Sequence, residues 1–408
     1  MSDLFDKENF PYFRKNPDAV FFDNASTTHI HDSVLSEILN YYSGYRASPG
    51  RGGYADTESA TIAVESARRS VADMLGPDVD PNDILFTTGA TQGLNWIAKW
   101  NSHLPGNVIV TEAEHNSNIV PWLSQGRTQN SGIEVIPMRN HYIAYHDCER
   151  IIKQQSRAGI LSTTTKSNLT GVATDWKMLA SVAKSGPMIA TALDMSQSIM
   201  LEDFSTSELP ISDFVDWAVF SGHKIFGPTG IGVLYAKNSF KRLPIYGGGG
   251  MVDDVTFNGF KLKSGVEVHQ AGTPDTAGII GMGMSCELLR WYGVDNYRKR
   301  VDYLYDVLIE LGLLEIPELQ FLGQEDTKTN IFSFTSTCVD VSDIATLLNQ
   351  QGISVRHGKM CAYPYAERLL SYREDIGILR ISLAAYNTES DCQKLVSALK
   401  QTIHKLTQ

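Results

Sequence analysis

The sequence predicts an α/β protein with a mostly parallel sheet covered by helices on both faces, followed by a smaller α+β lobe. Short apolar, β-branched runs alternate with helical stretches up to about residue 275, which is typical of such a sheet. Beyond that point helices and strands follow one another in a different pattern. A length of 408 residues, 42% of them hydrophobic, predicts two lobes or one unusually large core. We expect an N-terminal segment over residues 1–20 that packs on the small lobe, a large domain over 21–275 and a small domain over 276–408.

The elements of the larger lobe follow in order from apolar runs and turn residues. Residues 19–23 predict a short strand leading into the turn-rich NASTT, and residues 57–74 predict a helix that ends before a Gly-Pro break. Residues 84–100 combine a strand, a glycine turn and a helix. The glycine run at 247–250 is too flexible for a sheet and predicts a mobile loop or hinge. Further strands are expected within residues 107–118, 132–138, 158–168, 187–198, 216–227 and 230–236.

The smaller lobe is predicted to mix both element types. Helices are expected within residues 277–293, 297–312, 340–352 and 389–406, and strands within 330–336, 353–358 and 378–386. In a sheet of parallel strands, ligands gather where the strands end at their carboxyl side. Residues that bind ligands are therefore expected at strand ends.

Charge and cysteine content exclude several classes of function. A balance of 35 Lys+Arg against 46 Asp+Glu gives a net charge of -11 without a basic face, so no nucleic-acid partner is expected. The chain shows no leader-like segment and no apolar run as long as a membrane span, which predicts a cytoplasmic protein without membrane attachment. Its five cysteines form no C-x-x-C pair, so neither a disulfide framework nor a zinc knuckle is expected. His29 and His31 lack a third ligand at recognisable spacing, so no metal site is expected.

The segment FSGHKIFGPTG at residues 220–230 carries the strongest chemical signal. Lys224 follows the apolar strand DWAVF, stands beside Ser221 and His223, and precedes a glycine turn. A lysine desolvated at a strand end loses affinity for its proton and becomes a nucleophile toward aldehydes. The alternative is a surface lysine in a loop.

A second signal is Asp194, which ends the apolar strand in IATALDMSQS, with Gln197 three residues on. A carboxylate at the end of a buried strand is unfavourable unless it meets a cation or a strong donor. A protonated pyridine nitrogen would satisfy it, and such an aspartate keeps a pyridoxal ring an electron sink. A helix N-cap is the alternative role for this residue.

A third signal is TTGATQGLNW, where Gly89, Ala90 and Thr91 open a helix directly after a strand. Small residues let the backbone approach an anion, and the free N–H groups with the helix dipole favour a phosphate. The run GPTGIG at 227–232 does not fit a nucleotide fingerprint, because its glycine spacing is wrong and a strand follows it.

Taken together, the motifs resemble those of a known family. FDNASTT, TTGATQGLN, TEAEHNSNIVPW, SNLTG, LDMSQS, SGHKIFGPTGIGVLY, AGTPD, SVRHGKMCAYP and RISLAAYNTE occur in the order typical of class V, fold-type I pyridoxal phosphate enzymes. They are most similar to the Suf-type (group II) cysteine desulfurases, also called selenocysteine lyases. The resemblance extends from about residue 20 to residue 400. It implies a PLP-transferase fold type I with a seven-stranded, mostly parallel sheet, and pyridoxal 5′-phosphate as cofactor.

Carried over position by position, the resemblance implies roles for individual residues. Lys224 would hold the cofactor covalently, Asp194 would face its ring nitrogen, and His115 would stack on the ring and take part in proton transfers. Thr273 would reach the phosphate of the other subunit, which implies a homodimer with shared active sites. The remaining cofactor contacts would come from Gly89, Ala90, Thr91, Asn168, Gln197, Ser221 and His223, and the substrate contacts from Arg380, Arg356 and Asn168.

Cys361 lies in a polar stretch between two predicted strands, close in sequence to Arg356, His357 and Lys359. Cationic neighbours favour a reactive thiolate, whereas a lone cysteine is otherwise a small buried hydrophobic residue. The resemblance implies that Cys361 receives the sulfur of L-cysteine as a persulfide, releases L-alanine, and passes the sulfur to an acceptor protein, as in iron–sulfur cluster assembly.

Three stretches depart from the family pattern. SPGRGGY stands where N-V-H-R-G-x-H is usual, two histidines that often precede the cysteine are missing, and R-F-E before A-G-T-P is replaced. The residues found at these places are Gly50, Tyr54, Lys359, Met360, Val268, His269 and Gln270. They leave open two alternatives: another class V enzyme that does not use Cys361 (a C–S lyase, epimerase or aminotransferase), or a non-catalytic protein with the same fold.

Overall fold

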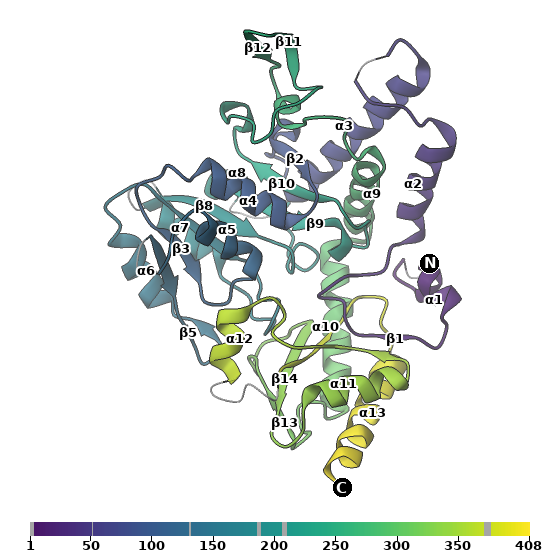
Figure 1. The fold of residues 1–408 in the computed structure, drawn as a ribbon. Helices are drawn as coiled ribbons and strands as arrows, with labels where there is room; N and C mark the ends of the chain where they lie inside the picture. Colours follow the sequence, from purple (N-terminus) through teal and green to yellow (C-terminus); the bar gives the residue numbers. More distant parts are fainter. Residues whose placement is uncertain (1–3, 51, 130–131, 186–188, 206–209, 371–376) are drawn as a thin grey trace.

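The described residues fold into two main sheets with their helices, joined by a long helix, and three two-stranded sheets. A computed structural model describes residues 4–50, 52–129, 132–185, 189–205, 210–370 and 377–408 (Figure 1). In Figure 1 the large sheet lies above the smaller green and yellow lobe, and α10 (Val294–Glu310) runs down from one to the other. The first two residues of the strand expected from residue 187 onward lie outside the described residues.

The central sheet has seven strands in the order β2-β10-β9-β8-β7-β3-β4. Neighbouring strands are parallel, except that β10 runs antiparallel to both β2 and β9. The predicted mostly parallel sheet is confirmed. Its strands are β2 (Ile84–Thr87), β3 (Val108–Thr111), β4 (Ile133–Ile136), β7 (Gly159–Thr164), β8 (Ile189–Asp194), β9 (Trp217–Ser221) and β10 (Gly232–Ala236).

Both faces of this sheet are apolar and covered. Successive side chains of a strand point to opposite faces, and Val219 and Leu234 lie in one buried cluster while their neighbours Phe220 and Val233 lie in another. The first cluster includes residues of α4, and the second includes residues of α3 and α9. The helices of the large lobe include α3 (Ala55–Leu75), α4 (Ala90–Trp100), α6 (Tyr145–Lys153), α7 (Trp176–Ser185) and α9 (Thr276–Tyr292).

Helix α9, with which the predicted small domain begins, packs against α2 (Asp32–Gly44) and α3. The approach of α9 to α3 is close, because a Cβ at Gly283 would lie 2.5 Å from Cα of Ala67. This helix therefore covers the large sheet, while the domain boundary near residue 275 stays a prediction.

The smaller lobe is built on a four-stranded antiparallel sheet in the order β13-β14-β17-β16. Strand β17 lies inside this sheet and carries Arg380. The elements of this lobe are β13 (Leu319–Phe321), β14 (Ile331–Ser336), α11 (Val341–Gln350), β15 (Ile353–Ser354), β16 (Arg356–His357), α12 (Tyr363–Leu370), β17 (Leu379–Ser382) and α13 (Glu389–Thr407).

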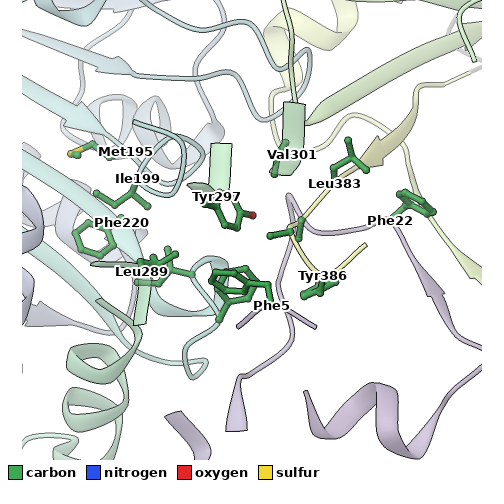
Figure 2. Close-up of a cluster of buried hydrophobic side chains, with 14 of the residues drawn as sticks. Phe5, Phe22, Met195, Ile199, Phe220, Leu289, Tyr297, Val301, Leu383 and Tyr386 are labelled. Atoms are coloured by element: carbon green, nitrogen blue, oxygen red, sulfur yellow. The ribbon is translucent and has the colours of Figure 1, made fainter. Parts of the chain in front are cut away.

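The N-terminal segment binds the lobes to each other. Strand β1 (Val20–Phe21) pairs in parallel with β15 of the small lobe. Phe5 packs on Phe226 of the large lobe, with 4.8 Å between ring centroids, and on Tyr292, with 4.5 Å. Figure 2 shows Phe5 in one apolar cluster with Phe220 of the large sheet and Tyr386 of the small lobe. The two lobes thus share a single buried core.

The remaining elements are short and lie mostly at connections. The glycine run at 247–250 forms no strand and precedes a hairpin of β11 and β12 that was not predicted; its mobility stays a prediction. No helix among the described residues combines the length and apolar character needed to cross a membrane. The short elements at the connections are α1 (Pro11–Lys15), α5 (Val120–Ser124), β5 (Met138–Arg139), β6 (Tyr142–Ile143), α8 (Ile211–Phe214), β11 (Val252–Thr256) and β12 (Gly259–Leu262), with 3-10 turns at Lys7–Asn9, Pro81–Asp83, Asn116–Asn118, Gly222–Lys224, Ser239–Lys241 and Val266–His269.

Candidate active site

A cavity of about 320 Å³ lies between the lobes, at the carboxyl ends of the central strands. It brings together most of the predicted site residues, although they come from segments far apart in the sequence. Two of the predicted residues, Gly89 and Thr273, do not line it. The predicted residues that line it are Ala90, Thr91, His115, Asn168, Asp194, Gln197, Ser221, His223, Lys224, Arg356, Cys361 and Arg380.

Lys224 ends the 3-10 turn that follows strand β9, and its side chain reaches into this cavity. Removal from bulk water lowers the pKa of Lys224, and the negative charge of Asp194 opposes this effect. The loop is held from outside, because the backbone N–H of Thr28 donates to the carbonyl of His223 at 2.8 Å. The surface-loop alternative is wrong, and the amine is partly desolvated, as nucleophilic chemistry requires.

Asp194 ends strand β8 beside Lys224. The residue as a whole is 5% exposed. One carboxylate oxygen accepts a hydrogen bond from the N–H of Ser196 at 3.0 Å. The other oxygen has no hydrogen-bond partner within the described parts of the chain, and the residue lines the cavity. An unpaired carboxylate oxygen in an enclosed site is complementary to a protonated ring nitrogen.

His115 lies between strand β3 and the turn Asn116–Asn118. Its Nδ1 accepts from the N–H of Ser117 at 3.0 Å, so a neutral ring carries its proton on Nε2. Burial, with the nearby positive charge of Lys224, lowers the pKa of His115 to about 4. The ring is therefore neutral at pH 7 and suited to stack on an aromatic cofactor.

The N-terminus of α4 lines one side of the cavity with Ala90 and Thr91. The backbone N–H of Ala90 donates to Oγ of Ser221 at 2.9 Å, and the hydroxyls of Thr91 and Ser117 lie 2.8 Å apart. Gly89 takes a φ of 149°, which lets the chain turn from β2 into the helix. Gly89 thus shapes this end of the site without lining it.

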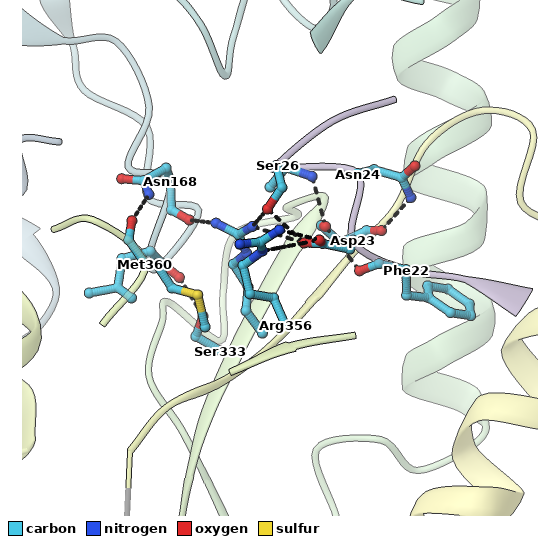
Figure 3. A network of polar contacts seen from close by, with 12 residues as sticks. Phe22, Asp23, Asn24, Ser26, Asn168, Ser333, Arg356 and Met360 are labelled. Carbon is cyan, nitrogen blue, oxygen red and sulfur yellow. Dashed lines mark hydrogen bonds and ion pairs between the residues drawn. The ribbon is translucent and has the colours of Figure 1, made fainter. Parts of the chain in front are cut away.

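Two arginines of the small lobe share one carboxylate, that of Asp23, which was not predicted as a site residue (Figure 3). Arg356 donates to Asp23 from Nε and Nη2 at 2.8 to 3.0 Å, and Arg380 donates from Nη2 at 3.1 Å. Arg380 also donates to Oγ of Ser26 and to the carbonyl of Asn168, while its buried Nε has no partner in the described residues. Burial lowers the pKa of Arg380 to about 10. Two cations on one anion leave a net positive charge facing the cavity.

Cys361 is exposed and sits on a strained loop at the mouth of the cavity. Met360 and Cys361 both take left-handed backbone conformations, with φ of 50° and 55°. The loop is tethered from the large lobe: Nδ2 of Asn168 donates to the carbonyl of Met360 at 2.6 Å, and the N–H of Asn116 donates to that of Cys361 at 2.6 Å. The buried-hydrophobe alternative is wrong for this cysteine.

Two of the three cations expected around Cys361 have carboxylate partners. Arg356 pairs with Asp23, and Nζ of Lys359 lies 3.0 Å from a carboxylate oxygen of Glu367. Each of these two positive charges is therefore shared with an anion.

Thr273 lies in a different cavity, of about 670 Å³, together with Gly50, Arg68 and Gln270. Two of the departures from the family pattern thus lie beside Thr273 rather than beside Lys224. The nearby His269 has a local role, since its Nε2 lies 3.0 Å from the carbonyl of Ser239. The two N-terminal histidines also have local contacts: His29 stacks on Tyr12 at 3.7 Å, and Nδ1 of His31 accepts from the N–H of Ser33.

Glu114, directly before His115, is a second residue that was not predicted. It is fully buried, and it accepts from Thr111 Oγ1 at 2.5 Å, from Asn118 Nδ2 at 2.7 Å and from the N–H of Thr164 at 2.8 Å. Burial raises the pKa of Glu114 to about 7, although these hydrogen bonds lower it. The carboxyl group ties the loop of His115 to the end of β7, which pairs with Asp194.

Comparison with known proteins gives a consistent result. A model of the family described as aminotransferase class-V matches residues 20–395. The cysteine desulfurase CsdA of Escherichia coli (strain K12) is 33% identical, over 95% of this chain and 94% of that protein. A probable cysteine desulfurase of Chlamydia trachomatis is 32% identical, over 97% and 98%.

Solved structures agree. The crystal structure of the E. coli cysteine desulfurase CsdA in an S-sulfonic acid form has a TM-score of 0.85 and 30% identity, and covers 98% of each chain. The apo structure of a cysteine desulfurase from Thermococcus onnurineus NA1 has a TM-score of 0.87 and 26% identity, with 98% of this chain and 97% of that chain covered. The predicted class V fold is confirmed, whereas the assignment to the Suf-type group stays a prediction.

The raised pKa of Glu114 predicts how the stability of the protein changes with pH. Because the folded carboxyl group releases its proton near pH 7 rather than near 4.5, the folded state binds more protons than the unfolded state between these values. Its contribution to stability is present below about pH 4.5 and is lost as the pH rises to 7. We expect the free energy of unfolding of the wild type, relative to Glu114→Gln, to fall by up to about 3 kcal/mol across this range. Urea unfolding at several pH values measures it, and a difference independent of pH would contradict the assignment.

Proposed function

This chain belongs to the aminotransferase class-V family, whose enzymes depend on pyridoxal phosphate, and we propose that it is a cysteine desulfurase that converts L-cysteine to L-alanine. The observation that carries the proposal is that one cavity holds a desolvated lysine, an unpaired carboxylate oxygen and an exposed cysteine. The named cysteine desulfurases, similar over nearly the whole chain, support the same reaction.

The residues of the cavity fit pyridoxal phosphate. The free oxygen of Asp194 would face the ring nitrogen, Lys224 would hold the aldehyde carbon, and His115 would stack on the ring. Thr91, Ser221 and His223 would hold the phosphate, and Asn168 and Gln197 would lie on the phenolic oxygen side. When bound, the cofactor supplies an electron sink for the electron pair left on the substrate Cα.

Lys224 is placed to move the Cα proton. Once the substrate amine takes its place, its Nζ is a free amine whose pKa is lowered by burial, so it can accept a proton near neutral pH. The neutral His115 offers an Nε2–H next to it. The carboxylate of Asp194 would face the ring nitrogen and would stabilise a positive charge there.

Cys361 is placed to receive the sulfur. Its Sγ, as the thiolate, attacks the substrate sulfur, so that an S–S bond forms and the substrate Cβ–S bond breaks. The electron pair of the broken bond goes to the substrate carbon, which takes a proton and leaves in alanine. The terminal sulfur stays on Cys361 as a persulfide, and its exposed position allows transfer to a sulfur acceptor protein.

Arg380 and Arg356 would bind the substrate carboxylate. Their shared partner Asp23 neutralises only one of the two charges. The Nε of Arg380 is enclosed and has no hydrogen-bond partner among the described residues. A planar guanidinium is suited to bidentate binding of a carboxylate.

We also propose a homodimer in which each active site is completed by Thr273 of the other chain. Thr273 lines a cavity separate from that of Lys224 in its own chain. Large apolar side chains on α2 and α3 are exposed, which is typical of an interface: Leu39, Tyr42 and Ile62.

All five cysteines are free, which supports the cytoplasmic location proposed for the protein.

Replacement of Cys361 by serine tests the sulfur-transfer step. The absorption of the bound cofactor should be unchanged, because Lys224 and Asp194 remain, while the release of sulfide and alanine should fall by about 10³-fold. Cys338→Ser, which removes the other exposed cysteine, is the matched control and should retain activity. Wild-type rates in Cys361→Ser, or pyruvate and ammonia in place of alanine, would favour a C–S lyase that does not need this cysteine.

A mixed dimer tests the shared site. In a dimer of one Lys224→Ala chain and one Thr273→Ala chain, sharing across the interface leaves one site with both native residues. Such dimers should regain about half of the wild-type activity and bind one cofactor at wild-type affinity, while each parent homodimer stays defective. If Thr273 acts within its own chain, no native site forms and the mixed dimer stays inactive. Full activity of a monomer in sedimentation would also contradict the proposal.

A further inference from the structure

A second cavity, of about 180 Å³, lies between the lobes behind the active site. Two chain segments separate the two cavities. Thr164 lines the active-site cavity while the next residue, Thr165, lines the second, and Gln197 and Ser198 divide in the same way. We call it the interlobe cavity, and its polar lining includes Thr165, Lys166, Thr174, Ser198, Asp302 and Asn330.

Lys166 is the unusual residue of this cavity. It is only 7% exposed, and its ammonium group forms no ion pair or hydrogen bond with any described residue. A buried cation without a partner is strongly unfavourable. Burial lowers the pKa of Lys166 to about 8, although Asp302 opposes this effect. At pH 7 the side chain is therefore still mostly charged, and its charge requires a partner.

Two further donors point to the same conclusion. Thr174 and Asn330 are 6% and 5% exposed. Neither the hydroxyl of Thr174 nor Nδ2 of Asn330 donates a hydrogen bond to any described residue. Oδ1 of Asn330, which is an acceptor, is enclosed without a partner. By contrast, the hydroxyls of Thr165 and Ser198 lie 2.6 Å apart and satisfy each other.

The other charged groups of the cavity show which charges are free. Arg298 pairs with Asp295, and Lys328 pairs with Asp306. Glu202 accepts from Nε1 of Trp176 and lies 3.5 Å from Nζ of Lys177. This leaves one cation, Lys166, and one anion, Asp302, that are too far apart to pair directly but line the same space.

We propose that the interlobe cavity binds a small zwitterion of the α-amino-acid class, whose carboxylate meets Lys166, Thr174 and Asn330 while its ammonium meets Asp302. A volume of 180 Å³ holds about six water molecules, which is enough for a small amino acid. A ligand with both charges would bridge Lys166 and Asp302, whereas a simple anion would leave Asp302 unpaired. The site does not depend on the chemistry of Cys361.

The proposed occupant would connect the two lobes. Lys166 and Thr174 belong to the large lobe, whereas Asp302 and Asn330 belong to α10 and the edge of the small lobe's sheet. Thr165, in the same wall, donates from its N–H and its hydroxyl to the carbonyl of Asp194 at 3.0 and 3.1 Å. Occupancy would therefore stabilise both the lobe arrangement and the segment that holds Asp194.

The test uses N,N-dimethylglycine, a zwitterion whose tertiary amine cannot react with the cofactor aldehyde. Thermal unfolding of the holoenzyme at pH 7 and constant ionic strength should show a saturable rise in Tm with this probe. Acetate and methylammonium each carry one of the two charges. Added together, they should raise the Tm by less than the zwitterion does alone. Lys166→Met and Asp302→Asn should each weaken the apparent affinity at least tenfold, and the second variant keeps the test valid if the first does not fold.

Lys177→Met is the matched control, because Lys177 lies outside the cavity and is already paired with Glu202. It should respond like the wild type, which shows that a loss of response in the cavity variants is not a general effect of removing a lysine charge. The wild-type response should disappear by about pH 9.5, when Lys166 has lost its proton. A linear, non-saturable response, an equal effect of acetate alone, or an unchanged response in both cavity variants would overturn the proposal.

Discussion

The carboxylate of Asp23, held by both Arg356 and Arg380, is the interaction on which the geometry of the active site depends (Figure 3). Asp23 follows β1, which is paired with β15 of the small lobe, so the N-terminal segment is anchored before it enters the site. A few residues later the same segment holds the large lobe, where Thr28 contacts the Lys224 loop and the carbonyl of Ala25 accepts from Gln197. Without Asp23, the buried Arg380 would lose the carboxylate that it shares with the half-exposed Arg356, and a buried cation without an anion is costly.

The rest of the site follows from how parallel strands end. β7, β8 and β9 are neighbours and end at the same edge, so Thr164, Asp194 and the Lys224 turn meet without any long excursion of the chain. The small lobe then covers this edge and adds Arg380 and the Cys361 loop. The loop is fixed by Asn168 and Asn116 of the large lobe, so Cys361 is positioned only when both lobes are in place.

The sequence predicted the parts of the site that local pattern controls. Lys224, Asp194 and the α4 N-terminus were predictable because each combines an apolar strand with a particular residue at its end. Cys361 needed the family resemblance, since nothing in its immediate sequence shows that it faces the cavity. Helix α2 was not predicted, although its apolar residues recur at helical spacing; only Val34 and Tyr41 of this helix are buried.

Asp23, Glu114 and Lys166 were not predicted, for a common physical reason. Their roles depend on partners far away in the sequence, or on the lack of one, and neither is visible in periodicity or spacing. Asp23 and Arg380 are 357 positions apart. Thr273 shows the opposite case: its motif was recognised, but in a single chain it lies in another cavity, so the cofactor role proposed for it would need a second chain.

The central claim is that Lys224, and not another enclosed lysine, carries the cofactor. Reduction of the yellow holoenzyme with borohydride fixes the cofactor to the amine that holds it, and peptide mass mapping locates the attachment. We expect the pyridoxyl mass on Lys224 alone, with none on Lys166, the other buried lysine near the site. Attachment to Lys166, or to Lys237 near the end of β10, would contradict this assignment of the active site.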